Sequence, residues 1–284
     1  MALIPAVVER KTKAHVPWGA KAVTTLVFLI LYVPLLTLIV YSFFDPVTGE
    51  WSSRWYVEAL YDESLRKAVT MSMIVGFWCT LGATLLGTTA ALALERTQFV
   101  GKKVLDALTL VPLVVPEIVF GLSLLIWFVA LRLSLGTISI VLAHITFSFS
   151  YVIITVRTRL HDFDMSLEEA ARDLGASSWQ TFWKVTFPLI FPAILSGALM
   201  AFTLSFDDFL ITFFTSGVAN DTLPVKLYAM IKFGISPKIN ALSTLILFAT
   251  IVLVLLAFRP KRKAKVVEAE AETSQEDSSI RLTA

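Results

Sequence analysis

Long runs of apolar residues dominate the sequence, and six of them are long enough to cross a hydrocarbon core of about 30 Å. These runs carry few or no charged residues and occupy positions 22–44, 68–94, 104–131, 136–156, 188–214 and 240–258. The pattern therefore predicts an all-α membrane protein with six transmembrane helices. Composition agrees, because 56% apolar residues, 16% charged residues and a mean hydropathy of +0.76 exclude an ordinary soluble domain.

Basic residues predict how these helices are oriented. Of the 24 Lys and Arg residues, 17 lie in the two tails or in the connections after the second and fourth runs. An even number of spans places both termini on one side, and the positive-inside rule makes that side the cytoplasm. We therefore expect a cytoplasmic N-tail (1–21), a transmembrane domain (22–258) and a cytoplasmic C-tail (259–284), whose acidic, Ser-rich composition indicates disorder.

Motifs for enzymatic chemistry are absent from the sequence. Without a Gly-x-x-x-x-Gly-Lys-Ser/Thr phosphate loop or a Gly-x-Gly-x-x-Gly motif, this chain alone should not hydrolyse ATP. The single cysteine, Cys79, has no partner and the three histidines are scattered, which argues against a catalytic or metal site. His144 lies in an apolar run, where a hydrogen bond between helices is the usual role. The expected surroundings are membrane lipid, and nothing indicates nucleic-acid binding.

One polar island interrupts the apolar pattern between the fourth and fifth runs, with the sequence SLEEAARDLGASSWQTFWKVTFPLI. Ser166 and Glu169 have the spacing of a capping box, which predicts a helix start. Gly175 is a natural left-handed C-cap, and Ser177 with Gln180 forms a second capping box. The island is therefore predicted to form two short helices with a bend at Gly175.

The first short helix has a narrow face of small residues. Leu167, Ala170, Ala171 and Leu174 recur at helical spacing, and Gly175 follows them. Small residues let another backbone approach closely, which favours a groove on a partner protein over a membrane surface. The alternative is a solvated linker that only orients the fifth span.

The same residues carry a family resemblance. Glu169-Ala170-Ala171, Gly175 after three residues, and residues 185–188 (VTFP) after nine more resemble the EAA loop of bacterial ABC-importer permeases. The resemblance implies the type I permease fold and a coupling helix, within a loop of about residues 158–187, that seats in a groove on a separate ATPase subunit. The residues expected to couple to the ATPase are Glu168, Glu169, Ala170, Ala171, Leu174 and Gly175.

Other segments are similar to the spermidine/putrescine permeases, in particular the second permease of each pair. They are SSRWY at 52–56, VPEIVFGLSLL at 115–125, LSFDDFLITFFTSG at 204–217 and TLPVKLYAMIKFGISPKINALSTLIL at 222–247. The resemblance implies a homologous second permease, a dimer of ATP-binding subunits that holds ATP and Mg²⁺, a periplasmic polyamine-binding protein, and the bacterial inner membrane. No cofactor is expected on this chain.

Charged residues well inside the apolar runs are all acidic, which favours a cationic substrate. Glu117 lies midway along the third run, directly after Pro116 and five residues after Pro112, and such prolines permit a broken helix that lines a cavity. Asp207 and Asp208 lie near the external end of the fifth run. Burial as a structural carboxyl is the alternative for Glu117, and helix capping is the alternative for the two aspartates.

Polyamines carry ammonium groups on an aliphatic chain, so aromatic faces could contact them through cation–π interactions. Phe206 and Tyr151 are the predicted aromatic contacts, and Phe120, Trp127 and Phe209 are also available. The predicted function is the permease subunit of an ATP-driven polyamine importer. The alternatives are a secondary transporter that exchanges protons at Glu117 and Asp207, and an ATP-driven permease for another cation or a neutral solute.

Overall fold

The structure is a computed structural model that describes residues 17–45, 48–218, 220–232, 234 and 236–257. Within these ranges it contains helices and one isolated β-bridge, between Phe44 and Trp51. The helices are α1 (Trp18–Ser42), α2 (Arg54–Tyr61), α3 (Glu63–Arg96), α4 (Lys102–Val114), α5 (Glu117–Ala130), α6 (Thr137–His161), α7 (Ser166–Asp173), α8 (Ser178–Thr181), the π-helix η1 (Phe182–Thr186), α9 (Phe187–Asp207), α10 (Leu210–Thr215), α11 (Leu223–Lys232) and α12 (Pro237–Ala257).

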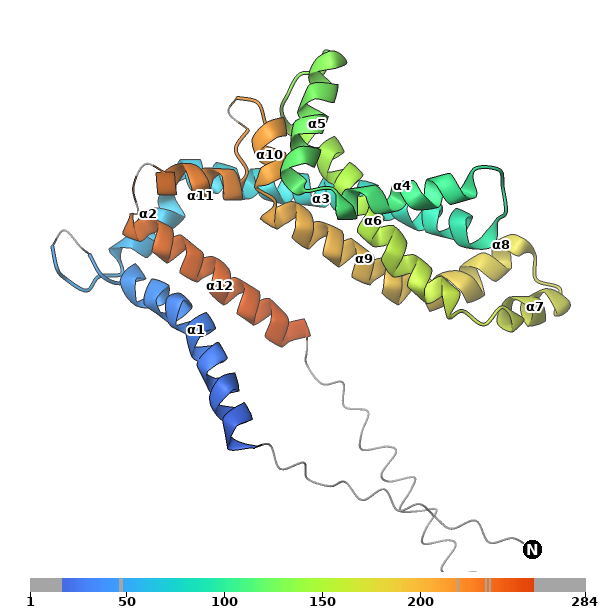
Figure 1. The fold of residues 1–284 in the computed structure, drawn as a ribbon, viewed down its shortest axis with the longest axis horizontal. Helices are drawn as coiled ribbons and strands as arrows, with labels where there is room; N and C mark the ends of the chain where they lie inside the picture. The colour runs from blue at the N-terminus through green and yellow to red at the C-terminus, as the bar shows by residue number, and fades with distance from the viewer. Residues whose placement is uncertain (1–16, 46–47, 219, 233, 235, 258–284) are drawn as a thin grey trace, which may run out of the picture. The chain divides into compact units, whose positions relative to one another are not determined.

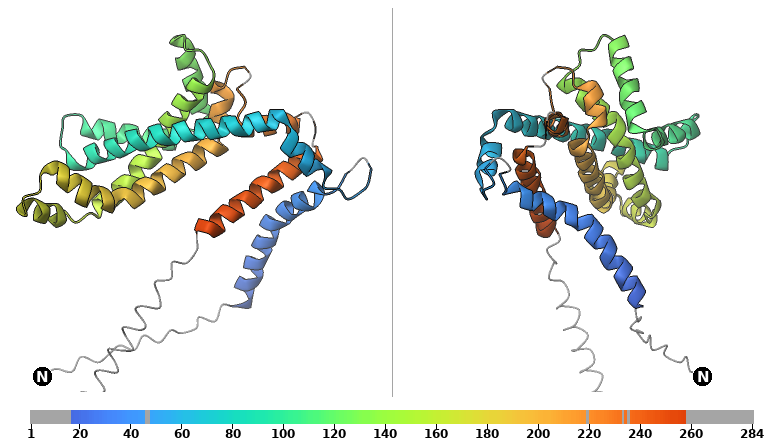
Figure 2. Two further views of the ribbon diagram at one scale, coloured as in Figure 1. Left: turned by 180° about the vertical axis from the view of Figure 1, so that it is seen from behind. Right: turned by 60° about the vertical axis from the view of Figure 1, so that its left-hand side comes forward.

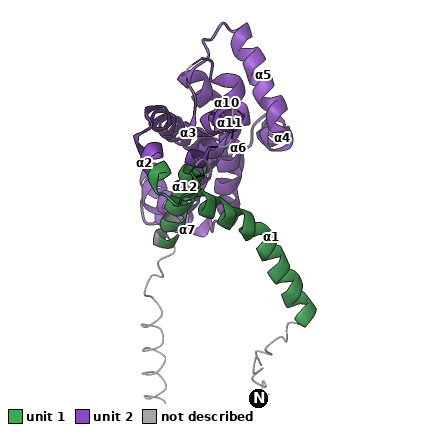
Figure 3. Ribbon diagram, turned by 90° about the vertical axis from the view of Figure 1, so that its left-hand side faces the viewer, with its two compact units in different colours: residues 1–56, 240–284 green, residues 57–239 purple. Residues whose placement is uncertain are grey.

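The chain divides into two compact units, residues 1–56 with 240–284 and residues 57–239 (Figure 3). In the first unit, Ser42 at the end of α1 shares a 2.6 Å hydrogen bond with the Tyr56 hydroxyl. The apolar side chains of α1 are largely exposed within this chain, as lipid-facing or partner-facing side chains would be. The predicted C-tail (259–284) and most of the predicted N-tail (1–21) lie outside the described residues.

Three long helices, α3, α6 and α9, pack against one another and form the core of the second unit (Figures 1 and 2). Close packing depends on glycine at position 87, where a Cβ atom would stand 2.7 Å from the Val152 Cβ atom and 3.0 Å from the Phe149 carbonyl oxygen. Ala83 and Ala91 on the same face of α3 are fully buried. The small residues of α3 therefore let α6 approach closely within this chain.

All six apolar runs of the sequence form helices, in α1, α3, the α4–α5 pair, α6, α9 and α12. Among the described residues, four helices are long and apolar enough to cross a membrane, or five if the bent α4–α5 pair counts as one span. The apolar segment of α12, Pro237–Val252, is shorter than these helices. The architecture is therefore the predicted all-helical membrane fold.

Two of the predicted spans are not continuous helices. The third breaks after Val114, and the axes of α4 and α5 differ by 112°. Pro116 directly precedes α5 and cannot donate the backbone hydrogen bond that would continue α4. The fifth predicted span runs to residue 214, but α9 ends at Asp207 and a separate short helix, α10, follows. The predicted proline break is confirmed, and the predicted end of the fifth span is wrong.

Candidate functional site

A carboxylate at the break between α9 and α10 caps the start of α10. Asp208 has an extended backbone (φ −67°, ψ 127°), so the chain leaves the helical path there. Its side chain accepts the backbone N–H groups of Ile211 at 3.3 Å and Thr212 at 2.8 Å. These are N–H groups of the first turn of α10 that lack helical partners, and a negative charge is favourable at this end of a helix. Asp208, one residue before the N-cap position Phe209, therefore caps the N-terminal end of α10 with its side chain.

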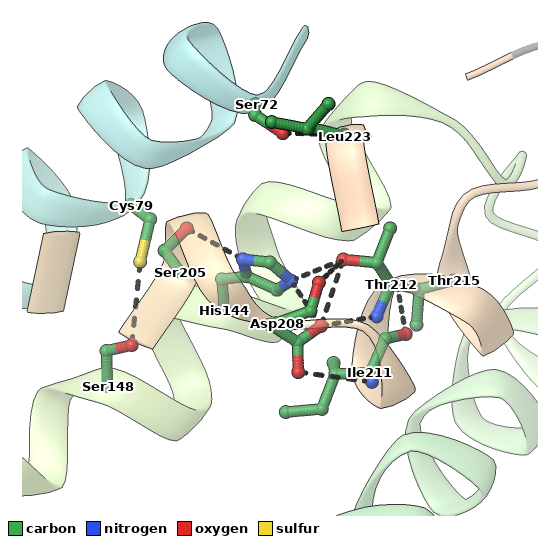
Figure 4. Close-up of polar contacts among 10 residues, drawn as sticks. All are labelled: Ser72, Cys79, His144, Ser148, Ser205, Asp208, Ile211, Thr212, Thr215 and Leu223. Atoms are coloured by element: carbon green, nitrogen blue, oxygen red, sulfur yellow. Dashed lines mark hydrogen bonds and ion pairs between the residues drawn. The ribbon is translucent and has the colours of Figure 1, made fainter. Parts of the chain in front are cut away.

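A buried histidine joins this cap to two other helices (Figure 4). His144 on α6 is 1% exposed, and its Nδ1 atom lies 2.7 Å from the Ser205 hydroxyl on α9. Its Nε2 atom lies 3.0 Å from the Thr212 hydroxyl and 3.2 Å from a carboxylate oxygen of Asp208. The Thr212 hydroxyl also donates to Asp208 at 2.9 Å. The predicted interhelical role of His144 is confirmed.

All three predicted pathway carboxylates line one small pocket of about 240 Å³ beside this break. Its lining residues are Glu117, Phe147, Thr203, Leu204, Asp207, Asp208, Phe209 and Leu210. Asp208 is engaged as described, whereas no hydrogen bond or ion pair within the described part of the chain involves the Glu117 or Asp207 side chain. The lining includes no Lys or Arg, so the pocket is acidic and suits a cation.

Close packing of α5 against α10 brings Glu117 to this pocket. Glu117 is the first residue of α5, immediately after the proline break. Gly121 lies one turn further along, where a Cβ atom would be 3.2 Å from the Ile211 Cα atom and 3.0 Å from the Phe214 ring. The two broken spans thus meet with their interrupted ends together, a common way to build a transport site in a membrane.

Aromatic rings continue from the pocket, although not all of the predicted rings lie there. Phe147 lines the pocket and packs against Phe120 and Tyr151, with ring centroids 5.8 and 5.4 Å away. Phe209 also lines it, whereas Phe206 stacks on Phe202 at 5.9 Å and is not among the lining residues. Trp127 is 60% exposed. Phe147 was missed from the sequence because nothing distinguishes it from other core phenylalanines.

The polar island folds into α7, a tight turn and α8, close to the prediction. Gly175 has a φ of +87°. Its N–H group donates to the carbonyl oxygen of Arg172, and the N–H group of Ala176 donates to the carbonyl oxygen of Ala171. This pair of bonds is a Schellman motif, so the predicted C-cap is confirmed. The second capping box is also confirmed, because Ser177 and Gln180 exchange side-chain to backbone hydrogen bonds.

Two details of the island differ from the prediction. Ser166 is not the N-cap of α7, because the Asp164 side chain accepts the Ser166 N–H group at 3.0 Å and begins the turn instead. The second short helix is not separate, since α8 continues through η1 into α9. Pro188 lacks the N–H group that would bond to the carbonyl four residues earlier, and a π-helical turn precedes it.

Glu168 and Glu169 occupy different environments despite being adjacent. Glu168 is 2% exposed, and its Oε1 atom accepts hydrogen bonds from Arg96 at 2.6 Å and from the Thr186 hydroxyl. Arg172 lies 3.6 Å from its other oxygen. Burial acts to raise the pKa of Glu168, but the hydrogen bonds of Thr186 and Arg96 outweigh it and hold the pKa below its usual value. Glu168 therefore ties α7 to the end of α3 and to η1.

The other predicted coupling residues form an open surface on α7. Glu169, Ala170, Leu174 and Gly175 are exposed and Ala171 is half-buried. Leu174 is 90% exposed, so this face presents one large apolar side chain beside its small residues. Glu168 is therefore buried within the chain, whereas the small-residue face of α7 is exposed.

Comparison with solved structures defines the class of fold. A bacterial ABC transporter involved in the import of the acidic polysaccharide alginate matches with a TM-score of 0.65 at 18% identity, over 85% of this chain and 96% of that chain. The MetNI methionine ABC transporter, in inward-facing conformations, matches with a TM-score of 0.53 at 16% identity, over 68% and 90%. The fold is therefore that of an ABC-importer membrane subunit.

Sequence comparison defines the family. Residues 83–260 match the family described as binding-protein-dependent transport system inner membrane component. The putrescine transport system permease protein PotI of Escherichia coli K12 is 42% identical over 82% of this chain and 86% of its own length. The spermidine/putrescine transport system permease protein PotC of the same strain is 38% identical over 81% and 89%. The chain belongs to this family of inner-membrane transport permeases. Membership of this family does not favour the alternative of an ion-gradient-driven transporter.

Proposed function

We propose that this chain is a permease subunit of an ATP-driven importer of polyamines such as putrescine and spermidine. The observation that carries the proposal is the acidic pocket, which combines carboxylates from two broken membrane helices and has no basic lining residue. Glu117 and Asp207 are the groups that contact substrate ammonium ions, since neither carboxylate has a hydrogen-bond or ion-pair partner among the residues that the structure describes. The names of the polyamine permeases that it resembles support the same substrate class.

Aromatic side chains contribute to the same path in this proposal. Phe147 and Phe209 contact the aliphatic part of the substrate and offer ring faces to its ammonium groups. Tyr151 extends this surface through Phe147. Asp208 remains a cap of α10. Phe206 directly precedes Asp207 on α9 but does not line the pocket.

The partners of the proposed complex follow from the class of importer. They are a homologous second permease, two ATP-binding subunits that hold ATP and Mg²⁺, and a periplasmic polyamine-binding protein. The complex lies in the bacterial inner membrane with both termini of this chain in the cytoplasm. This chain hydrolyses no ATP and holds no cofactor of its own.

Coupling in this proposal runs through α7. The exposed face of Ala170, Leu174 and Gly175 seats in a groove on an ATP-binding subunit, and Glu169 contacts its rim. Glu168 transmits the movement of α7 to α3 through Arg96 and to α9 through Thr186. The ATPase must bind the two conformations of the permease with different affinities, because only differential binding shifts a conformational equilibrium.

Reconstitution tests the proposal. The chain is purified with its co-expressed partners, placed in vesicles with ATP inside and out, and supplied with receptor loaded with radiolabelled putrescine or spermidine. We expect the loaded receptor to stimulate both ATP hydrolysis and uptake. Uptake that persists with an ATPase-dead partner would refute the ATP-driven mechanism, and ATP-driven uptake of another solute class in place of polyamines would refute the substrate.

A further inference from the structure

His144 connects three separate segments at the break in the fifth span. Its ring reaches Ser205 in the last two turns of α9 on one side of the break, and Thr212 and Asp208 on the other side (Figure 4). The ring itself belongs to α6, which packs in the core of the unit. One side chain therefore fixes how α9 ends and α10 begins relative to α6.

The hydrogen bonds around Asp208 show which nitrogen of this ring donates toward it. The Thr212 hydroxyl donates its proton to Asp208, so its oxygen accepts from Nε2–H of His144, which also lies 3.2 Å from the carboxylate. Nδ1 shares a 2.7 Å hydrogen bond with the Ser205 hydroxyl. Each polar group in the network has a partner, as a buried membrane site requires.

This network engages mainly one oxygen of Asp208. Its Oδ2 atom accepts from the Thr212 N–H group and hydroxyl and lies 3.2 Å from His144 Nε2, whereas its Oδ1 atom accepts from the Ile211 N–H group. Asp207 is the preceding residue and lines the same pocket without a hydrogen bond or ion pair in the described part of the chain. The direction in which Asp207 leaves α9 is set by the break that His144 holds.

We propose that His144 is a positioning residue of the transport pathway, which holds the α9–α10 break so that Asp207 and Glu117 face the same pocket, where neither carboxylate has a partner among the described residues. The assignment of a polyamine to that pocket rests on the proposed function, whereas the positioning itself does not. His144 touches no substrate. Its effect reaches the pocket through Asp208, Ser205 and the backbone of the break.

A labelling experiment tests the positioning without any substrate. Cysteine is placed at position 207 (Asp207→Cys) in a Cys79→Ser background, and its rate of reaction with a charged maleimide is measured in the assembled complex. We expect His144→Leu to change this rate at least about threefold, while Ser148→Ala, which removes a buried hydroxyl one turn away on α6, leaves it unchanged. An unchanged rate in the His144→Leu complex would overturn the proposal.

Transport variants test the consequence for the substrate. We expect His144→Leu to reduce putrescine uptake about tenfold, as the loss of one charge-assisted hydrogen bond predicts, with complex yield and basal ATP hydrolysis retained. His144→Gln keeps an N–H donor and an acceptor and should restore most uptake. His144→Leu should add little to Asp208→Asn, because both variants remove the same contact.

The outcomes separate the two proposals. Wild-type uptake of putrescine with equal uptake in His144→Leu overturns the positioning role alone. A wild-type complex that does not import polyamines overturns the proposed substrate, and the labelling rates still decide whether His144 positions Asp207. Independent, multiplicative effects of His144→Leu and Asp208→Asn would also contradict the inference.

Discussion

The polar break within the membrane and the coupling loop outside it use carboxylates in opposite ways. In the loop, Glu168 is buried against the guanidinium group of Arg96, so the negative charge is neutralised within the chain. In the break, Asp208 is held by a backbone N–H group, a hydroxyl and an imidazole, and Glu117 and Asp207 have no hydrogen-bond or ion-pair partner within the described residues. A membrane protein gains nothing in stability from uncompensated carboxylates in its spans, since each costs about 2.5 to 3.5 kcal/mol on insertion scales.

The difference separates a structural clamp from a binding site. A buried ion pair that is complete inside the chain holds two elements together and asks for no ligand. An acidic pocket whose carboxylates have no partner among the described residues calls for a cation from outside, whether a proton, an ion or a substrate. Changing one carboxylate in each region is therefore the most direct way to break or sharpen this comparison.

The largest effect is expected for Glu117→Gln in the pocket. Loss of a charge-assisted contact of about 1.5 to 3 kcal/mol corresponds to a fall in uptake of about ten- to a hundredfold. Stability should not fall, because Glu117 has no partner within the described chain. Uptake by the reconstituted complex and thermal unfolding of the permease measure the two quantities. Glu50→Gln, an exposed position outside the apolar runs, is a control that should change neither. Normal uptake by Glu117→Gln would remove Glu117 from the pathway.

An effect of similar free energy, on stability rather than on transport, is expected for Glu168→Gln in the loop. The variant leaves Arg96 without its 2.6 Å partner, and the loss of charged hydrogen bonds should lower the free energy of unfolding by about 1.5 to 3 kcal/mol. Limited proteolysis within residues 158–187 and chemical denaturation measure this. The matched control is the neighbouring Glu169→Gln, which should leave stability unchanged because Glu169 is exposed. Equal destabilisation by both variants would contradict the clamp.

The stability of the α7 loop should depend on pH more strongly in the wild type than in Glu168→Gln, which lacks the buried ion pair. The folded-state pKa of Glu168 lies below its usual value, so its stabilising contribution is fully present above that usual value. The contribution is lost as the pH falls through the lowered pKa. Proteolysis of the α7 loop should therefore accelerate at acidic pH in the wild type and depend less on pH in Glu168→Gln. Parallel pH profiles for the two proteins would argue against this assignment.

Much of this arrangement follows from short-range sequence signals. The apolar runs predict the helices, and Gly175 and the Ser177–Gln180 pair predict the turn after α7, because all of these signals act within a few residues. Ser166 was predicted wrongly as an N-cap for a local reason as well. Asp164, two residues earlier, offers a competing acceptor.

The contacts that define the two sites could not be predicted in this way. Arg96 is 72 positions from Glu168, and His144 is 68 positions from Thr212. Such partners are selected by how α3, α6 and α9 pack, which periodicity does not specify. The carboxylates were identified from the sequence because charge is rare inside a span. Their meeting in one pocket depends on two helix breaks, of which only the proline break was predicted.

The smallest effect is expected for Gly175→Ala at the turn after α7. At a φ of +87° an L-residue costs about 1 to 2 kcal/mol, but a Cβ atom at this position meets nothing within 4 Å in this chain. The loss should therefore be backbone strain alone in the isolated permease. Gly101→Ala is the matched control, because Gly101 has a φ of +92° and equally open surroundings. If the α7 face contacts the ATPase, Gly175→Ala should weaken co-purification of the ATPase more than Gly101→Ala does at similar permease stability. Equal co-purification for the two variants would leave Gly175 with a role in the turn only.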